Sequence, residues 1–171
     1  MPAIPFAIVV AHAADLPLVA RLAHEIWQRH YPGIISQAQI DYMLAQGYSR
    51  DALSRYVGSP DAGLALATRD GDAIGFVGWY RMDASDTMKL DKLYVLPEHH
   101  GAGTGRALIE HVVARAHAAG CTSVSLNVNR GNVNAVRAYE RCGFAIRERG
   151  DFPIGNGFVM EDYIMVRDLH R

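Results

Sequence analysis

97-PEHHGAGTGRALIEHVV-113 joins an apolar run to an amphipathic one, and its three glycines alternate with small residues. The N-terminus of a helix carries unpaired N–H groups and a partial positive charge. Glycines let an anion approach such a backbone closely and permit positive φ. Arg106 adds a cation that can contact a phosphate. The segment therefore predicts a strand-to-helix turn that binds a phosphate or a pyrophosphate.

Two common phosphate-binding patterns do not fit this turn. The Walker pattern needs four residues between its glycines, then Lys and Ser or Thr, whereas Gly105 is followed by Arg106 and Ala107. The dinucleotide pattern needs one more residue before its third glycine and an acidic residue about twenty positions later. Residues 120–130 contain no acidic residue. A glycine-rich turn that binds nothing remains an alternative at this point.

Strand and helix patterns alternate on both sides of the turn. Strands are expected over 6–11, on both sides of Asp70-Gly71 within 62–82, and over 87–96, 123–129, 144–149 and 158–169. Helices are expected over 18–31 and 37–46, about 50–57, from the glycine turn to about 119, and over 132–142. The order implies antiparallel hairpins together with a β-α-β crossover. The sheet should therefore be mixed.

Length and composition limit the classes of function. The 171 residues suit a single domain over 1–171, and about half of them are hydrophobic, which is typical of a globular protein. A net charge of −1 argues against nucleic acid or an anionic membrane surface as partner. No run approaches the roughly 18 apolar residues of a membrane span. Cys121 and Cys142 do not make a disulfide framework, so we expect a reduced, cytoplasmic protein.

Two ordered motifs resemble a known family. The run 93-LYVLPEHHGAGTGRAL-108 is similar to the coenzyme A signature of the GNAT N-acetyltransferases, whose core is Gln/Arg-x-x-Gly-x-Gly/Ala. The residues Asn132-x-x-Ala-x-x-x-Tyr139-Glu-x-x-Gly-Phe144 resemble a later motif of that family at the expected distance. The resemblance covers 62–149 and implies an α/β fold of the GNAT (acyl-CoA N-acyltransferase) type, with a mixed central sheet of about seven strands flanked by helices. His100 stands where the family usually has Gln or Arg.

The resemblance also implies a set of coenzyme-binding residues. The pantetheine arm is expected along Leu93, Tyr94 and Val95. The pyrophosphate is expected on His100, Gly101, Ala102, Gly103, Thr104, Gly105 and Arg106. Asn132, Asn134 and Tyr139 complete the set, although a helix-capping role is the favoured interpretation of Asn132.

Tyr139 is the expected catalytic residue. Coenzyme A leaves as a thiolate when an amine attacks the thioester, and a nearby phenol can donate a hydrogen bond to that sulfur. Ordinary pKa values of roughly 10 for Tyr and 8.5 for a thiol make full proton transfer uphill by about 2 kcal/mol. Stabilisation of the developing charge is therefore the expected role. The alternative is a buried aromatic residue that anchors its helix to the sheet.

The amine must lose a proton before attack, and the sequence does not assign the group that accepts it. The candidates are Glu25, His30, Asp91 and Asp162. Strict strand alternation groups Asp91 with Leu93, and Lys92 with Leu90 and Tyr94. One of the two charges, Asp91 or Lys92, should therefore face the covered side of the sheet or a cleft.

In the family that the sequence resembles, the first two helices and the last hairpin generally select the acceptor. The substrate-binding candidates are Trp27, Tyr31, Asp91 and Asp162, whose carboxylates and aromatic rings suit a cationic amine. Core packing is the favoured alternative for Trp27. The tail 155-GNGFVMEDYIM-165 is similar to a subgroup associated with polyamine acetylation.

The sequence thus predicts transfer of an acetyl group from acetyl-CoA to a primary amine of a small molecule or a peptide, by direct attack in a ternary complex. The histidines have no spacing that suits a metal, so no metal is expected. A non-catalytic coenzyme A sensor is the alternative from another class, because of His100 and the unassigned base. A longer acyl donor and a homodimer are left open.

Overall fold

The computed structural model describes residues 6–83 and 85–170. Its strands and helices follow the predicted order. The strands are β1 (Ala7–Val10), β2 (Ala62–Arg69), β3 (Asp72–Arg81), β4 (Thr87–Val95), β5 (Ser123–Asn129), β6 (Ala145–Gly155) and β7 (Phe158–Asp168). The helices are α1 (Leu16–His30), α2 (Gln37–Gly47), α3 (Arg50–Ser54), α4 (Thr104–Ala118) and α5 (Val133–Arg141). No helix in these two ranges is long and apolar enough to cross a membrane.

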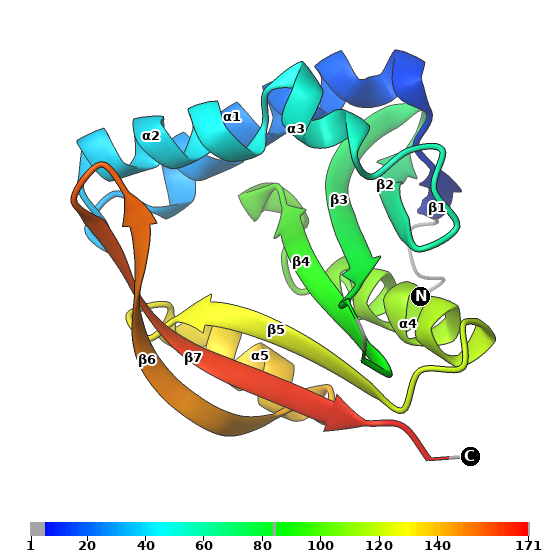
Figure 1. The fold of residues 1–171 in the computed structure, drawn as a ribbon. Coiled ribbons are helices and arrows are strands. Elements are labelled where there is room, and N and C mark those ends of the chain that lie inside the picture. Colours follow the sequence, from blue (N-terminus) through cyan, green and yellow to red (C-terminus); the bar gives the residue numbers. More distant parts are fainter. Residues whose placement is uncertain (1–5, 84, 171) are drawn as a thin grey trace.

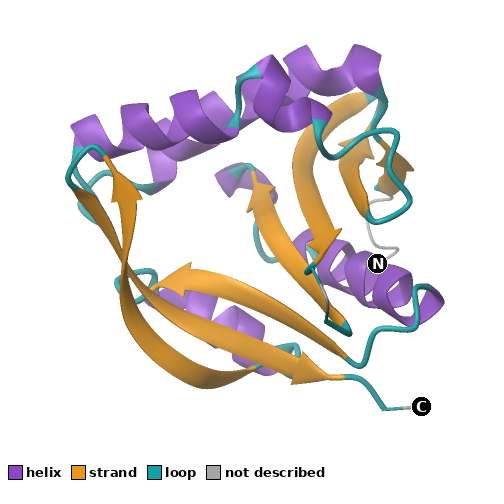
Figure 2. Cartoon of the chain, in the orientation of Figure 1, coloured by secondary structure: helices purple, strands orange, loops and turns teal. Residues whose placement is uncertain are grey.

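One seven-stranded sheet, in the order β1-β2-β3-β4-β5-β7-β6, separates two layers of helices (Figures 1 and 2). The β4–β5 pair is parallel and all other neighbours are antiparallel, which confirms the predicted mixed sheet. One apolar core lies under the sheet against α4 and α5, and includes Leu108, Val112 and Val136. A second lies between the sheet and the helices α1 to α3, and includes Ile26 and Ile40.

Local signals set several boundaries as predicted. Asp70 and Gly71 both have positive φ (52° and 84°), which is the geometry of a type I′ hairpin turn between β2 and β3. The Ser36 hydroxyl caps α2 by accepting a hydrogen bond from the Gln39 N–H at 3.1 Å. Gly47, however, is the last residue of α2 rather than a left-handed cap. A Cβ there would lie 3.3 Å from the Lys92 ammonium, so the site favours a glycine for space.

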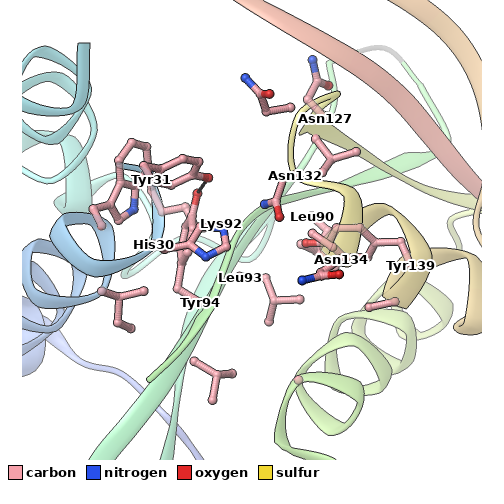
Figure 3. A pocket seen from close by; sticks show the side chains of 18 of the residues that line it. His30, Tyr31, Leu90, Lys92, Leu93, Tyr94, Asn127, Asn132, Asn134 and Tyr139 are labelled. Carbon is pink, nitrogen blue, oxygen red and sulfur yellow. Dashed lines mark hydrogen bonds between the residues drawn. The ribbon is translucent and has the colours of Figure 1, made fainter. Parts of the chain in front are cut away.

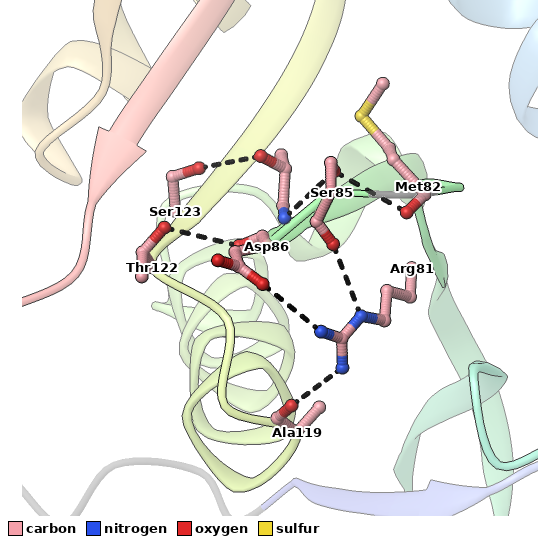
Figure 4. A network of polar contacts seen from close by, with 8 residues as sticks. Arg81, Met82, Ser85, Asp86, Ala119, Thr122 and Ser123 are labelled. Carbon is pink, nitrogen blue, oxygen red and sulfur yellow. Dashed lines mark hydrogen bonds and ion pairs between the residues drawn. The ribbon is translucent and has the colours of Figure 1, made fainter.

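The parallel strands β4 and β5 pair only at one end, through Thr87–Lys89 and Ser123–Ser125. Beyond these residues they run apart (Figure 1). A polar network holds the paired end together (Figure 4). Arg81 donates to the Ala119 carbonyl at 2.8 Å and forms an ion pair with Asp86 at 3.4 Å. These contacts join the β3–β4 turn to the end of α4. They hold the paired ends of β4 and β5 in place, at the point from which the two strands diverge.

A β-bulge lies in the free part of β4. Gly78 pairs with Lys92 and Trp79 pairs with Leu90, so Asp91 is an extra residue in the ladder. The bulge puts Leu90 in the same core as Leu93, on the face opposite Tyr94. The predicted grouping of Leu90 with Lys92 and Tyr94 is therefore wrong, because strict alternation does not hold across a bulge.

Candidate active site

The divergence of β4 and β5 opens into a cleft of about 1020 Å³. Both helical layers contribute to its walls, and Figure 3 shows His30 and Tyr31 on one side and Asn134 and Tyr139 across from them. The predicted site residues that line it are Trp27, Tyr31, Asp91, Leu93, Tyr94, Val95, His100, Gly101, Gly103, Gly105, Arg106, Asn132, Asn134, Tyr139 and Asp162. Ala102 and Thr104 do not line it. The fold therefore brings almost all of the predicted set together.

The edge of β4 that faces the cleft has no strand partner after Lys89. Leu93, Tyr94 and Val95 still pair with β3 on their other edge. Backbone N–H and C=O groups on an unpaired edge need partners, and an extended ligand can supply them. His100 already uses one such group, because its Nε2–H donates to the Val95 carbonyl at 2.8 Å. This contact occupies Nε2, so that nitrogen is not free to bind a phosphate.

The glycine turn is open toward the cleft. Gly101 and Gly103 have φ of 80° and 85°, and a Cβ at either position would meet no heavy atom within 4 Å. Gly103 is the N-cap of α4, so the free N–H groups of its first turn lie beside the cleft. Thr104 points away and is only 2% exposed, because it anchors the start of α4 in the protein interior. The open backbone and the exposed Arg106 at the rim can hold an anion.

Helix α5 and its N-cap position bring the last three predicted residues to the cleft, Asn132, Asn134 and Tyr139. Asn132 is at the N-cap position, but its side chain makes no capping hydrogen bond, so the favoured capping role is wrong. It lies buried at the cleft wall instead, while Asn134 is exposed. Tyr139 packs its ring against Phe144 at 5.8 Å and presents the phenol to the cleft. Burial raises the pKa of Tyr139, which keeps the phenol protonated and able to donate a hydrogen bond.

An aromatic cluster forms the α1 wall of the cleft. Trp27 is buried, with its ring 4.4 Å from Tyr31 and 5.5 Å from Tyr94, so it serves the core as well as the wall. The hydroxyls of Tyr31 and Tyr94 are hydrogen-bonded to each other at 3.0 Å (Figure 3). Burial raises the pKa of Tyr31 to about 12, so both phenols stay neutral. This aromatic part of the wall is therefore uncharged.

A charged group that sequence reasoning identified only in part lies deeper in the cleft. Lys92 is 9% exposed, and its ammonium lies 4.2 Å from the centre of the Tyr48 ring and 3.8 Å from Asp91. The Tyr56 hydroxyl donates to Asp91. Burial lowers the pKa of Lys92, and Asp91 partly opposes this effect. The adjacent charges Asp91 and Lys92, next to the apolar run 93–96, were the signal for this cluster, but nothing in the sequence indicated Tyr48 or Tyr56.

The last hairpin closes the cleft from the side of α2. Tyr42 donates from its hydroxyl to the Ile154 carbonyl at 2.8 Å, and the Gln39 side chain donates to the Val159 carbonyl at 3.0 Å. Asp162 on β7 lines the cleft beneath this roof. Its Oδ2 accepts a hydrogen bond from the Asn127 side-chain amide on β5, at 3.4 Å. Of the four base candidates, His30, Asp91 and Asp162 line the cleft, whereas Glu25 lies outside it in an ion pair with Arg29.

Comparisons with known proteins agree with this geometry. The family described as Acetyltransferase (GNAT) family matches residues 21–144. An uncharacterized N-acetyltransferase of Mycobacterium tuberculosis is 32% identical over 155 residues, which cover 91% of this chain and 98% of that protein. Spermidine N(1)-acetyltransferase of Thermoplasma acidophilum is 25% identical over 86% of this chain and 90% of its own length.

A solved structure shares the fold. The PaiA N-acetyltransferase from Thermoplasma acidophilum, in complex with coenzyme A, superimposes with a TM-score of 0.83 at 23% identity, over 96% of this chain and 99% of that one. The mixed seven-stranded sheet with flanking helices is thus the GNAT fold that the sequence predicts. Given the match over most of its length, the chain belongs to the GNAT family and is an N-acetyltransferase.

Proposed function

We propose that the protein transfers the acetyl group of acetyl-CoA to a primary amine by direct attack within a ternary complex. One observation carries this proposal: the unpaired edge of β4 leads from the splay point to the open glycine turn, and Tyr139 faces the same cleft. The cleft volume of about 1020 Å³ is at the upper end of ordinary ligand pockets, which supports room for a second substrate beside the first. Both reactants can therefore be held at once, which direct attack requires.

The donor would lie along β4. Its pantetheine amides would pair with the backbone of Leu93–Val95, and its pyrophosphate would bind the N–H groups from Gly101 to Gly105 with help from Arg106. The glycines support this arrangement, because the space that a side chain would fill at Gly101, Gly103 and Gly105 is open. Phosphate oxygens can therefore approach the backbone closely. Asn134 is a further contact on the α5 side. His100 would then act on the strand edge, through Val95, rather than on the phosphate.

Tyr139 would donate a hydrogen bond to the coenzyme sulfur as the thiolate leaves. Its raised pKa makes it a poorer acid than free tyrosine, so complete proton transfer is disfavoured while donation is retained. Preorganised donors directed at a developing negative charge are effective in a site that excludes water. The role of Tyr139 is therefore stabilisation of the leaving group.

The acceptor would bind between the α1 wall and the last hairpin. Tyr31, Asp91 and Asp162 line this part of the cleft with Trp27. The similarity to a spermidine N(1)-acetyltransferase supports polyamines as one class to test. Amino acids, aminoglycosides and peptide N-termini are the other classes. Both cysteines are free thiols, in keeping with a cytoplasmic reaction.

The test combines binding and turnover. Acetyl-CoA should raise the melting temperature, and a panel of amines from the four classes should release free thiol at a rate that depends on the amine. Varying both substrates should give intersecting double-reciprocal lines, as expected of a ternary complex. Parallel lines, or acetylated Cys142 found by mass spectrometry after incubation with acetyl-CoA alone, would contradict direct attack. Stabilisation without turnover would favour the sensor, and no stabilisation would refute both functions.

A further inference from the structure

The two carboxylates in the cleft differ in how their oxygens are satisfied. Asp91 accepts a hydrogen bond from Tyr56 and lies beside the Lys92 ammonium. Asp162 is more deeply buried, at 5% exposure, and its Oδ1 has no hydrogen-bond partner among the described residues. Its Oδ2 has only the long contact with the Asn127 amide. A buried carboxylate oxygen without a donor is costly for the folded protein unless a ligand supplies one.

Asp162 is directed into the cleft by the register of β5 and β7. It pairs with Asn129, so both side chains lie on the face of the sheet opposite Val128, which belongs to the core under the sheet. Hydrogen bonds from α2 hold the roof over this face. Oδ1 of Asp162 therefore lies in a pocket whose walls are held by backbone pairing and by hydrogen bonds from α2.

The cations close to Asp162 have other partners. The Lys89 ammonium donates to the Asn127 side-chain oxygen. The Arg130 guanidinium donates to the Gly150 carbonyl at 2.8 Å and pairs with Asp151 at 2.9 Å, and it meets Asp162 only at the main-chain carbonyl, 3.3 Å away. Among the described residues, therefore, no cation forms an ion pair with the Asp162 carboxylate. An ammonium group from a ligand has the charge and the donors that this oxygen needs.

We propose that Asp162 binds the ammonium group of the acceptor and takes its proton; this rests on the acetyl transfer proposed above. The carboxylate accepts one proton from R–NH₃⁺ and leaves R–NH₂, whose lone pair forms the N–C bond to the acetyl carbonyl. The C–S bond breaks, and the sulfur leaves as a thiolate beside Tyr139. The second proton lost by the nitrogen ends on this sulfur. The proton on Asp162 returns to solvent after the amide has left.

The surroundings make this transfer easier than it is in water. Burial raises the pKa of Asp162, and the hydrogen bond from Asn127 and the charges of Lys89 and Arg130 only partly oppose this. The neutral phenol of Tyr31 faces it from α1. The same burial lowers the pKa of an ammonium that enters the pocket. The difference between the pKa of the ammonium and the pKa of Asp162 therefore decreases, which favours proton transfer from the amine to the carboxylate.

His30 and Asp91 are weaker candidates on geometric grounds. His30 is the last residue of α1 and lines the cleft close enough to Asn132 and His100 for both to act on its pKa. Burial and the charge of His100 lower its pKa, which disfavours proton uptake. Asp91 already has a donor and a cation, so an acceptor would have to displace them.

The test compares Asp162→Asn with Glu161→Gln, the same change at the exposed neighbouring position of β7. For the most active amine of the panel, Asp162→Asn should lower kcat/KM by about 100-fold or more. The rate of the wild type should rise with pH as Asp162 ionises, and this limb should be missing in the variant. The Kd of acetyl-CoA should stay within about twofold for both variants, and Glu161→Gln should match the wild type in rate.

An alkoxyamine analogue of the same acceptor separates proton uptake from a structural role, because it is neutral at the assay pH. The deficit of Asp162→Asn should shrink at least tenfold with this analogue. An equal deficit with both acceptors, or a raised KM with unchanged kcat and an unchanged pH profile, would overturn the proposal. Asp162→Ser serves the same comparison if the Asn variant does not fold. Absent acetyl-CoA binding in the wild type would instead count against the proposed function itself.

Discussion

Replacing Gly103 tests the anion site at the start of α4. Gly103→Glu and Gly103→Ala form a matched pair, because a side chain at this position enters open space. Both replacements force an L residue into the left-handed region, at φ of 85°. This costs about 1–2 kcal/mol, which corresponds to about 2–8 °C in melting temperature for a chain of this size. Both variants carry the same backbone strain, so the difference between their affinities for coenzyme A reports the effect of the carboxylate alone.

The expected effect on binding follows from Coulomb's law. A carboxylate about 5 Å from one phosphate charge costs about 1 kcal/mol in water and about 3 kcal/mol at the effective dielectric of a protein surface. Two charges of a diphosphate give about 2–6 kcal/mol. Gly103→Glu should therefore weaken coenzyme A binding between about 30-fold and about 20,000-fold. Gly103→Ala should change it less than about threefold.

Isothermal titration with coenzyme A at two salt concentrations measures both effects, and thermal unfolding confirms that both variants fold. The penalty from the carboxylate should decrease at high salt, since the site is open to solvent. Equal affinities for Gly103→Glu and Gly103→Ala would refute the placement of the diphosphate at this turn.

Three further predictions follow from other parts of the molecule. Tyr139→Phe should lower kcat about 10-fold to 150-fold, because a hydrogen bond to a charged group contributes about 1.5–3 kcal/mol. Tyr163→Phe, on the opposite face of the sheet, is the control and should leave kcat unchanged. Both variants should keep the Kd of coenzyme A. Burial raises the pKa of Asp162, so the folded protein favours the protonated carboxyl more than the unfolded chain does. The protonated carboxyl therefore stabilises the fold below about pH 4, and this stabilisation is lost as the pH rises through the pKa of the folded protein. Melting curves across pH should therefore find Asp162→Asn more stable than the wild type at pH 7, by about 1–3 kcal/mol, but not near pH 4. Arg81→Met should lower the unfolding free energy in urea by about 1–3 kcal/mol, since the Ala119 carbonyl loses its donor; an unchanged midpoint would contradict the role of the network.

Most of the architecture could be predicted because its signals are local. The apolar segments on both sides of Asp70-Gly71 predicted β2 and β3, and Asp70-Gly71 predicted the turn between them. The glycine turn with the Asn132–Phe144 motif identified the family and, with it, the residues proposed to bind the coenzyme. These features depend on residues that are close in sequence, and a single chain shows them directly.

The features that escaped prediction depend on contacts between distant segments. The bulge at Asp91 has no signature in the run 87–96, yet it decides which face Leu90 occupies. The strand β6 continues to Gly155 although the pattern suggested an end at 149, because an edge strand tolerates Pro153. Asn132 has the residue type of a cap, but its side chain faces the cleft. The unpartnered oxygen of Asp162 becomes visible only when β5, β7 and α2 are assembled.

The roofing hairpin has a consequence for how such enzymes diversify. In the proposed arrangement, the donor-binding residues from Leu93 to Tyr139 lie inside the part of the chain that matches the family, whereas Ile154, Met160 and Asp162 follow its last matched residue, 144. The hairpin share of the proposed acceptor site is thus separate in sequence from the donor site, while Trp27 and Tyr31 supply the share on α1. A chimera that exchanges 145–170 between two relatives would therefore alter the preference for an amine and leave binding of the thioester with the host.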